Sequence, residues 1–185
     1  VSVTRYFSEA SLPADPATPW HGLWVHSYFQ QQGQCALEVT PGLPIKGKNM
    51  VEKFAGRCLC GAVQFECSAE PVFQANCHCD DCRRNTGAVY GSLVFVPVEA
   101  LSIRGTTGSY QHLSDAGNTM TKYFCPTCGS QMFTSNTRRP ERRGVRVGVI
   151  DDASWFQATA YVYSCRSLPS TPLDPAVKAF DKMPA

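Results

Sequence analysis

The chain has 185 residues, of which 43% are hydrophobic, so it is long enough for one sizeable domain or for one domain with an appendage. Its formal net charge is +2, which gives no electrostatic case for nucleic acid or a membrane surface as a partner. No stretch approaches the roughly 20 apolar residues that a membrane-spanning helix needs, and no secretory signal is visible. These features predict a soluble protein of the cytoplasm.

The first 49 residues differ from the rest of the chain. They are rich in Pro, Gln, Ser and aromatic residues and show neither a helical nor a strand period. From Met50 onwards the sequence becomes strongly patterned. We therefore expect residues 1–49 to be an N-terminal extension outside the native domain, and residues 50–185 to form that domain. In the alternative, residues 1–49 are a genuine segment that packs on the domain through its aromatic side chains, Trp20, Trp24, Tyr28 and Phe29.

Short strand-like segments follow Met50, spaced about ten residues apart with Gly and Pro between them. This spacing is typical of a mainly β domain built from several small sheets. We also expect a short helical turn after Cys79 and a short helix near Pro175–Phe180. The expected strands cover residues 62–67, 90–96, 101–103, 109–113, 119–124, 131–134, 144–150 and 156–163.

Five arginines lie before and within one of these expected strands. In a chain of nearly balanced charge, such a run is typical of a solvated surface loop or strand edge. The alternative is a rim that binds an anion. The five are Arg138, Arg139, Arg142, Arg143 and Arg146.

Ten cysteines are many for a chain of this length, and their grouping indicates what they do. Cysteines only a few residues apart rarely form a disulfide with each other because the geometry is strained, but they share a metal ion easily. We therefore predict zinc binding over a set of redox or structural disulfides. Seven of the ten fall into three tight groups, Cys58-Leu59-Cys60, Cys77-His78-Cys79-Asp80-Asp81-Cys82 and Cys125-Pro126-Thr127-Cys128.

The last group has the Cys-x-x-Cys form of a zinc-binding turn. Gly129, which follows Cys128, permits the positive φ that often completes such a turn. Two ligands do not complete a tetrahedral zinc site, so a second pair is needed. Cys58 and Cys60, which are also flanked by Gly, are the obvious partners of Cys125 and Cys128. The four cysteines together predict a closed, structural zinc site.

The remaining group offers three sulfurs, from Cys77, Cys79 and Cys82, to a second zinc ion. No other grouped cysteine is left, so the fourth position is open to water or a substrate, as in catalytic zinc sites. His78 is a competing fourth ligand, although its place between two ligands would turn its side chain away from the metal.

The net negative charge of this second site requires positively charged neighbours. Three thiolates on a divalent zinc leave one net negative charge, which makes the metal a weaker Lewis acid unless positive neighbours offset it. Arg83 and Arg84 directly follow Cys82, and we expect one of them to contact the thiolates or to receive a substrate carboxylate. Arg83 and the three cysteines form the candidate catalytic set.

Three motifs occur in the order and spacing of a known family. They are Cys-x-Cys-Gly at residues 58–61, Cys-His-Cys-x-x-Cys-Arg-x-x-Thr-Gly at 77–87 and Phe-Cys-x-x-Cys-Gly-Ser at 124–130. Over roughly residues 54–165 the chain resembles the glutathione-dependent formaldehyde-activating enzyme family, which also contains centromere protein V. The resemblance implies several small coiled antiparallel sheets around zinc, a structural zinc on Cys58, Cys60, Cys125 and Cys128, and a catalytic zinc on Cys77, Cys79 and Cys82.

The family's reaction joins glutathione to formaldehyde and is classed, in the reverse direction, as that of a carbon–sulfur lyase. The resemblance therefore implies a lyase-type enzyme with two zinc ions per chain, which adds a thiol such as glutathione to formaldehyde or another small electrophile. Two alternatives stay open: a non-catalytic, zinc-stabilised binding module, or a lyase or isomerase that acts on a different small molecule. The sequence carries no signal for an oligomeric state.

Overall fold

The computed structural model describes residues 52–184, and the expectations for residues 1–49 lie outside this range. Within it the chain forms a mainly β domain with short helical turns, as predicted. None of its helices in this range has the length and apolar composition to cross a membrane. The elements are β1 (Phe54–Arg57), β2 (Gln64–Cys67), β3 (Phe73–Cys77), α2 (Asp80–Thr86), β4 (Gly91–Pro97), η1 (Val98–Ala100), β5 (Leu101–Arg104), β6 (Gly108–Leu113), β7 (Thr119–Phe124), β8 (Gln131–Asn136), β9 (Arg142–Arg146), η2 (Val147–Val149), β10 (Ala160–Val162), η3 (Ser164–Arg166) and β11 (Lys178–Phe180).

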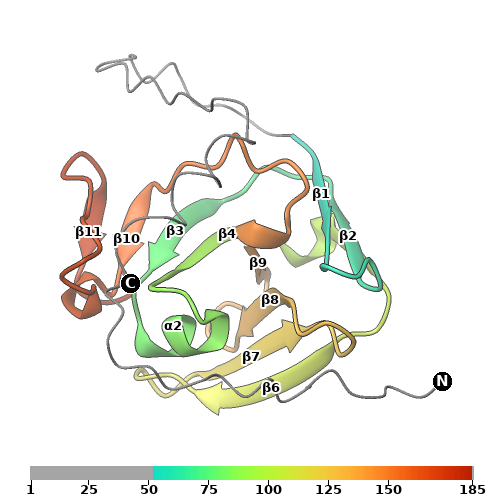
Figure 1. Cartoon of the computed structure of the whole chain (residues 1–185), viewed down its shortest axis with the longest axis horizontal. Helices are drawn as coiled ribbons and strands as arrows, with labels where there is room; N and C mark the ends of the chain where they lie inside the picture. The colour runs from blue at the N-terminus through green and yellow to red at the C-terminus, as the bar shows by residue number, and fades with distance from the viewer. Residues whose placement is uncertain (1–51, 185) are drawn as a thin grey trace, which may run out of the picture. The chain divides into compact units, whose positions relative to one another are not determined.

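The strands form one small and one large sheet. The small sheet is antiparallel, with the order β1-β2-β5, and the large one has eight strands in the order β11-β10-β3-β4-β9-β8-β7-β6. The large sheet is antiparallel except at β10, which pairs in parallel with both β3 and β11. Figure 1 shows this sheet curving round α2, so that the helix lies inside the curve.

The segment near Pro175–Phe180 is a turn followed by strand β11, so the expected short helix there is wrong. β11 pairs in parallel with β10, with Ala160 opposite Lys178 and Val162 opposite Phe180. A free sheet edge beside the segment decides its conformation, because strand formation depends on neighbouring strands more than on local propensity. The expected strand over 144–150 is also shorter, since β9 ends at Arg146 and the chain continues into η2.

Strand β4 divides the hydrophobic core into two clusters. Its apolar run is buried on both faces, as expected for a strand with packing partners on either side. Val94 and Val96 belong to the larger cluster, which also contains Cys58 and Cys125. Leu93 belongs to the smaller cluster, with Ala75, Cys77, Cys82, Ala160 and Val162. The two groups of cysteines are therefore built into different clusters.

Phe65 on β2 joins the small sheet to the large one. Its ring meets that of Phe54 edge-on at a centroid distance of 6.1 Å and that of Phe133 edge-on at 5.4 Å. Phe54 and Phe65 come from the small sheet, whereas Phe133 lies on β8 of the large one. Such edge-to-face pairs contribute about 0.5–1.5 kcal/mol each beyond the burial of apolar area. The contact therefore holds the two sheets together beside the turn that carries Cys58 and Cys60.

We predict that Phe65→Ala lowers the free energy of unfolding by about 3–5 kcal/mol, because it leaves a cavity between the two sheets. Leu113→Ala is the control: Leu113 is 70% exposed, so its truncation is expected to change stability by no more than about 0.5 kcal/mol. Urea unfolding followed by circular dichroism measures both. Equal effects of the two substitutions would contradict the assignment of Phe65 to the junction of the sheets.

Candidate metal centres

The structure brings Cys58, Cys60, Cys125 and Cys128 together from two turns far apart in the sequence. Their Sγ atoms all lie within 4.8 Å of one another. The Sγ atoms of Cys58 and Cys60 are 3.5 Å apart, and those of Cys60 and Cys125 are 3.8 Å apart. The first pair follows β1 and the second pair follows β7. The geometry is that of four sulfurs arranged round one point, as a closed tetrahedral site requires.

Local backbone chemistry explains why both turns present their sulfurs inwards. Gly61 and Gly129 adopt φ values of 78° and 75°, in the left-handed region that Gly occupies without strain. The amide of Gly61 donates to the carbonyl of Cys58, and that of Gly129 donates to the carbonyl of Cys125. The amide of Val63 donates to Sγ of Cys58 at 3.2 Å. Both turns therefore close on themselves while their sulfurs point towards each other.

Cys128 and Cys60 have very different pKa values. Hydrogen bonds from the hydroxyl and the amide of Ser130 lower the pKa of Cys128 to about 5. The amide of Ala62 also favours the thiolate of Cys60, but hydrogen bonding to the three other cysteines and burial together outweigh it and raise the pKa of Cys60 to about 12. Thiolate is the form that binds zinc, and part of this group is already poised to supply it.

The second group joins the end of β3 to the start of α2. Cys77 ends the strand, Cys79 caps the helix and Cys82 lies within its first turns. Their Sγ atoms also lie within 4.8 Å of one another, with 3.4 Å between Cys77 and Cys79. The amide of Cys82 donates to Sγ of Cys79 at 3.3 Å, so this sulfur takes the role of an N-cap side chain. Three sulfurs thus converge, and no fourth His, Cys, Asp or Glu of residues 52–184 joins them.

His78 is turned away from the sulfurs, as its place between Cys77 and Cys79 suggests. Its ring lies 5.2 Å from the ring of Tyr90 and 5.9 Å from that of Tyr161, and burial lowers its pKa. With these two tyrosines it lines a separate pocket of about 320 Å³. His78 therefore does not complete the three-sulfur group.

The sequence does not predict the role of Arg146 at the three-cysteine group. It is only 4% exposed, so the expectation of a solvated loop or strand edge is wrong at this position. The reason is that β9 lies inside the sheet, between β4 and β8, and Arg146 faces α2. Its Nη1 donates to Sγ of Cys82 at 3.9 Å, and its Nη2 donates to Oδ1 of Asn85 at 2.9 Å.

A second cation, Lys122 on β7, is equally buried, at 4% exposure. Arg146 and Lys122 act on Cys82 together. Hydrogen bonds from Cys77 and Cys79 are the main cause of a pKa of Cys82 well below the usual thiol value, and the two positive charges lower it further. The pKa of Cys77 rises well above that value because its proton is shared with Cys79 and Cys82. These contacts therefore favour the thiolate form of Cys82 over that of Cys77.

Arg83, the expected positive neighbour, faces outwards. Its Nη2 donates to Oδ1 of Asp80 at 2.8 Å, and the side chains of both residues are 38% exposed. Asp80 also pairs with Arg166, whose other nitrogen pairs with Asp115 at 2.8 Å. Arg83 thus belongs to a surface network beside the capping residue Cys79. The charge that contacts a sulfur comes from Arg146 instead.

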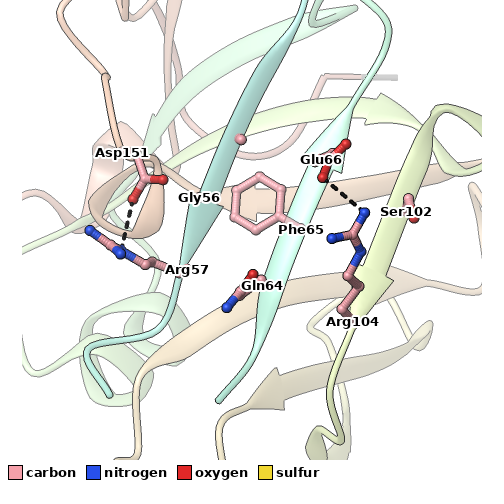
Figure 2. A pocket seen from close by; sticks show the side chains of 9 residues that line it. Gly56, Arg57, Gln64, Phe65, Glu66, Ser102, Arg104 and Asp151 are labelled. Atoms are coloured by element: carbon pink, nitrogen blue, oxygen red, sulfur yellow. Dashed lines mark ion pairs between the residues drawn. The ribbon is translucent and has the colours of Figure 1, made fainter. Parts of the chain in front are cut away.

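A pocket of about 150 Å³ on the small sheet is an alternative place for chemistry (Figure 2). Its charged groups are already paired: Arg57 contacts Asp151 at 3.4 Å, and Arg104 contacts Glu66 at 3.2 Å. All four side chains are more than half exposed, and surface pairs of this kind contribute little to stability. The pocket contains no cysteine, so the two sulfur groups are the stronger candidates.

Comparison with known proteins agrees with the family that the three cysteine motifs indicate. The model of the family described as glutathione-dependent formaldehyde-activating enzyme matches residues 53–166. The chain belongs to this family. The chain is similar to a Rhodobacter sphaeroides protein of known crystal structure. The two share 28% sequence identity with a TM-score of 0.43, and the match covers 52% of this chain and 87% of that chain. No curated protein matches this family member.

Gly91, at the start of β4, makes room for the contact between Arg146 and Cys82. A Cβ atom at this position would overlap Nη1 of Arg146 and come within 3.3 Å of Cβ of Cys82. The guanidinium reaches the sulfur because position 91 carries no side chain.

Gly91→Ala is predicted to push the guanidinium of Arg146 off Cys82 and to lower the free energy of unfolding by about 1–3 kcal/mol, as overpacking of a core usually does. The matched control is Gly148→Ala, since a Cβ atom at Gly148 meets nothing within 4 Å. Denaturant unfolding of the two variants gives the difference. If Gly91→Ala lowered the free energy of unfolding no more than the control does, the guanidinium of Arg146 would not depend on the absence of a side chain at position 91.

Proposed function

We propose that this member of the family is a zinc-dependent enzyme of the carbon–sulfur lyase type, which adds glutathione to formaldehyde or to another small electrophile. The observation that carries the proposal is the inequality of the two sulfur groups. Four sulfurs suffice to close a tetrahedral site, whereas three leave one position for a reactant. Membership of the glutathione-dependent formaldehyde-activating enzyme family supports the choice of thiol and aldehyde.

Zinc is the metal that best fits the donors. Both groups consist of thiolate donors alone, which suit a soft or borderline cation, and their sulfur separations allow a common tetrahedral centre. We assign two zinc ions per chain: a structural one to Cys58, Cys60, Cys125 and Cys128, and a catalytic one to Cys77, Cys79 and Cys82. The nine cysteines among residues 52–184 are all free thiols, which supports a reducing compartment such as the cytoplasm.

The chain's residues have separate roles in this proposal. When bound, zinc lowers the pKa of a thiol ligand and polarises a carbonyl oxygen. The three cysteines hold the ion with one position open, and Arg146 stabilises the thiolate of Cys82. Arg83 lies beside the capping residue Cys79, half-exposed, and we assign it to a carboxylate of the thiol substrate, in exchange for Asp80.

A non-catalytic, zinc-stabilised binding module is the second candidate. It would need only the closed site, which joins the turn after β1 to the turn after β7. The three-cysteine group would then have no role. Yet three features stabilise it: Cys79 caps α2, the buried Arg146 contacts Cys82, and Gly91 leaves room for the guanidinium. We therefore favour the enzyme.

The first test counts zinc. We predict about two ions per chain for the native protein and about one for Cys79→Ser, with the fold retained. Cys125→Ser should unfold the domain, because a structural zinc contributes on the order of 10 kcal/mol to such sites. Cys165→Ser is the control, since Cys165 is exposed and outside both groups. Elemental analysis measures the zinc content, and circular dichroism measures the fold. One ion in the native protein, or equal unfolding of Cys79→Ser and Cys125→Ser, would rule out the two-site assignment.

The second test measures turnover. Zinc-loaded protein is expected to accelerate the formation of S-hydroxymethylglutathione from glutathione and formaldehyde, as followed by proton NMR against the uncatalysed reaction. Cys79→Ser should abolish the acceleration, whereas Cys165→Ser should leave it unchanged. No acceleration by the native protein would refute this pair of substrates while leaving the zinc count intact.

A further inference from the structure

Arg146 and Lys122 are buried charges without a carboxylate partner. Each is 4% exposed, and neither takes part in any ion pair within residues 52–184. A buried charge is costly unless another charge compensates it, and the cost rises further when two cations lie near one another. Their compensation must come from something else inside the fold.

The nearby carboxylates are engaged elsewhere. Asp80 pairs with Arg83 and Arg166, and Asp81 accepts a contact from His112 at 3.2 Å. Both acidic residues of α2 are therefore held in other pairs. Lys122 pairs with Thr134, Thr134 pairs with Gly144, and Arg146 lies two residues beyond Gly144, so the two cations share one face of the large sheet. The sulfurs of Cys77, Cys79 and Cys82 are the negative groups that remain, and Nη1 of Arg146 contacts one of them.

The formal charges of this ensemble do not cancel when the zinc site is filled. Three thiolates on a divalent ion leave one negative charge, and the two buried cations add two positive charges. The complete ensemble is left with one positive charge, in an interior where an uncompensated charge is unfavourable. A singly negative donor in the open position would make it neutral, whereas a neutral donor would not.

We propose that Arg146 and Lys122 set the charge of the three-cysteine site so that its open position selects a singly negative donor, such as a thiolate, over a neutral one. The inference rests on the proposed function in one respect, namely that the site holds a divalent zinc. It adds two specificity-determining residues, from β9 and β7, and it names the form in which a thiol substrate binds.

Cobalt in place of zinc makes the open site visible. Divalent cobalt bound by thiolates absorbs in the visible and near-ultraviolet, and added ligands change only the spectrum of a site with a free position. Azide serves as the singly negative probe and imidazole as the neutral one, at about pH 8, where imidazole is uncharged. Protein loaded in the same way but carrying Cys79→Ser gives the background of the four-cysteine site.

Arg146→Gln and Lys122→Met each remove one charge and are expected to weaken azide binding by about tenfold or more, since a unit charge this close acts through an effective dielectric constant of about 20. Imidazole binding should change by less than about threefold. Arg146→Lys, which keeps the charge, should retain most of the azide affinity. Arg142→Gln is the control on the same strand, because Arg142 is part-exposed and paired with Glu141.

Three results would overturn the inference. They are unchanged azide affinity in both charge-removing variants, equal loss of azide and imidazole binding, and loss of azide binding in Arg146→Lys as large as in Arg146→Gln. If Arg146→Gln does not fold, Lys122→Met and Arg146→Lys still decide the question. A native protein that binds no cobalt at the three-cysteine group would refute the proposed function as well, so the two failures are told apart by the native spectrum.

Discussion

Thiolate charge inside a small β domain is the constraint on which the rest of this structure depends. Seven cysteines converge in two groups, and each group must stabilise negative sulfur where at least two of its cysteines are buried. At the four-cysteine group, turn amides and Ser130 do so. At the three-cysteine group, a helix cap and two buried cations do so. The difference follows from place: the first group sits on turns rich in free amides, whereas the second sits between a helix and a sheet.

Strand β4 separates the two cysteine groups. Successive side chains of a strand point to opposite faces, so Leu93 packs with the three-cysteine cluster while Val94 packs with the four-cysteine cluster. A ligand change in one group is therefore separated from the other by a packed layer. The large sheet curves round α2 (Figure 1), and Arg146 of β9 contacts Cys82 and Asn85 of this helix.

The parts of the site that could be predicted are those encoded locally. The short spacings within each cysteine group and the glycines beside them indicate which sulfurs converge, and the three-dimensional groups are the same. Arg146 could not be found in this way, because its contact with Cys82 joins residues 64 positions apart. It belongs to a run of arginines in the sequence, and such a run is typical of a solvated surface, although of the four others Arg138 alone is exposed and the rest are half-buried. The polar residues of β3, Gln74 and Asn76, likewise obscured a strand whose Asn76 bonds to Ser92 on β4.

The choice of arginine at position 146 has a geometric reason as well as an electrostatic one. A guanidinium offers several N–H groups in a fixed plane, so one side chain can bind Sγ of Cys82 and Oδ1 of Asn85 together. Asn85 in turn donates to Oε1 of Gln131 on β8 at 2.8 Å. Charge and position are thus fixed by one network that runs from β9 through α2 to β8. A lysine could supply the charge but not both bonds at once, so it would balance the sulfurs while leaving the C-terminal part of α2 less firmly held.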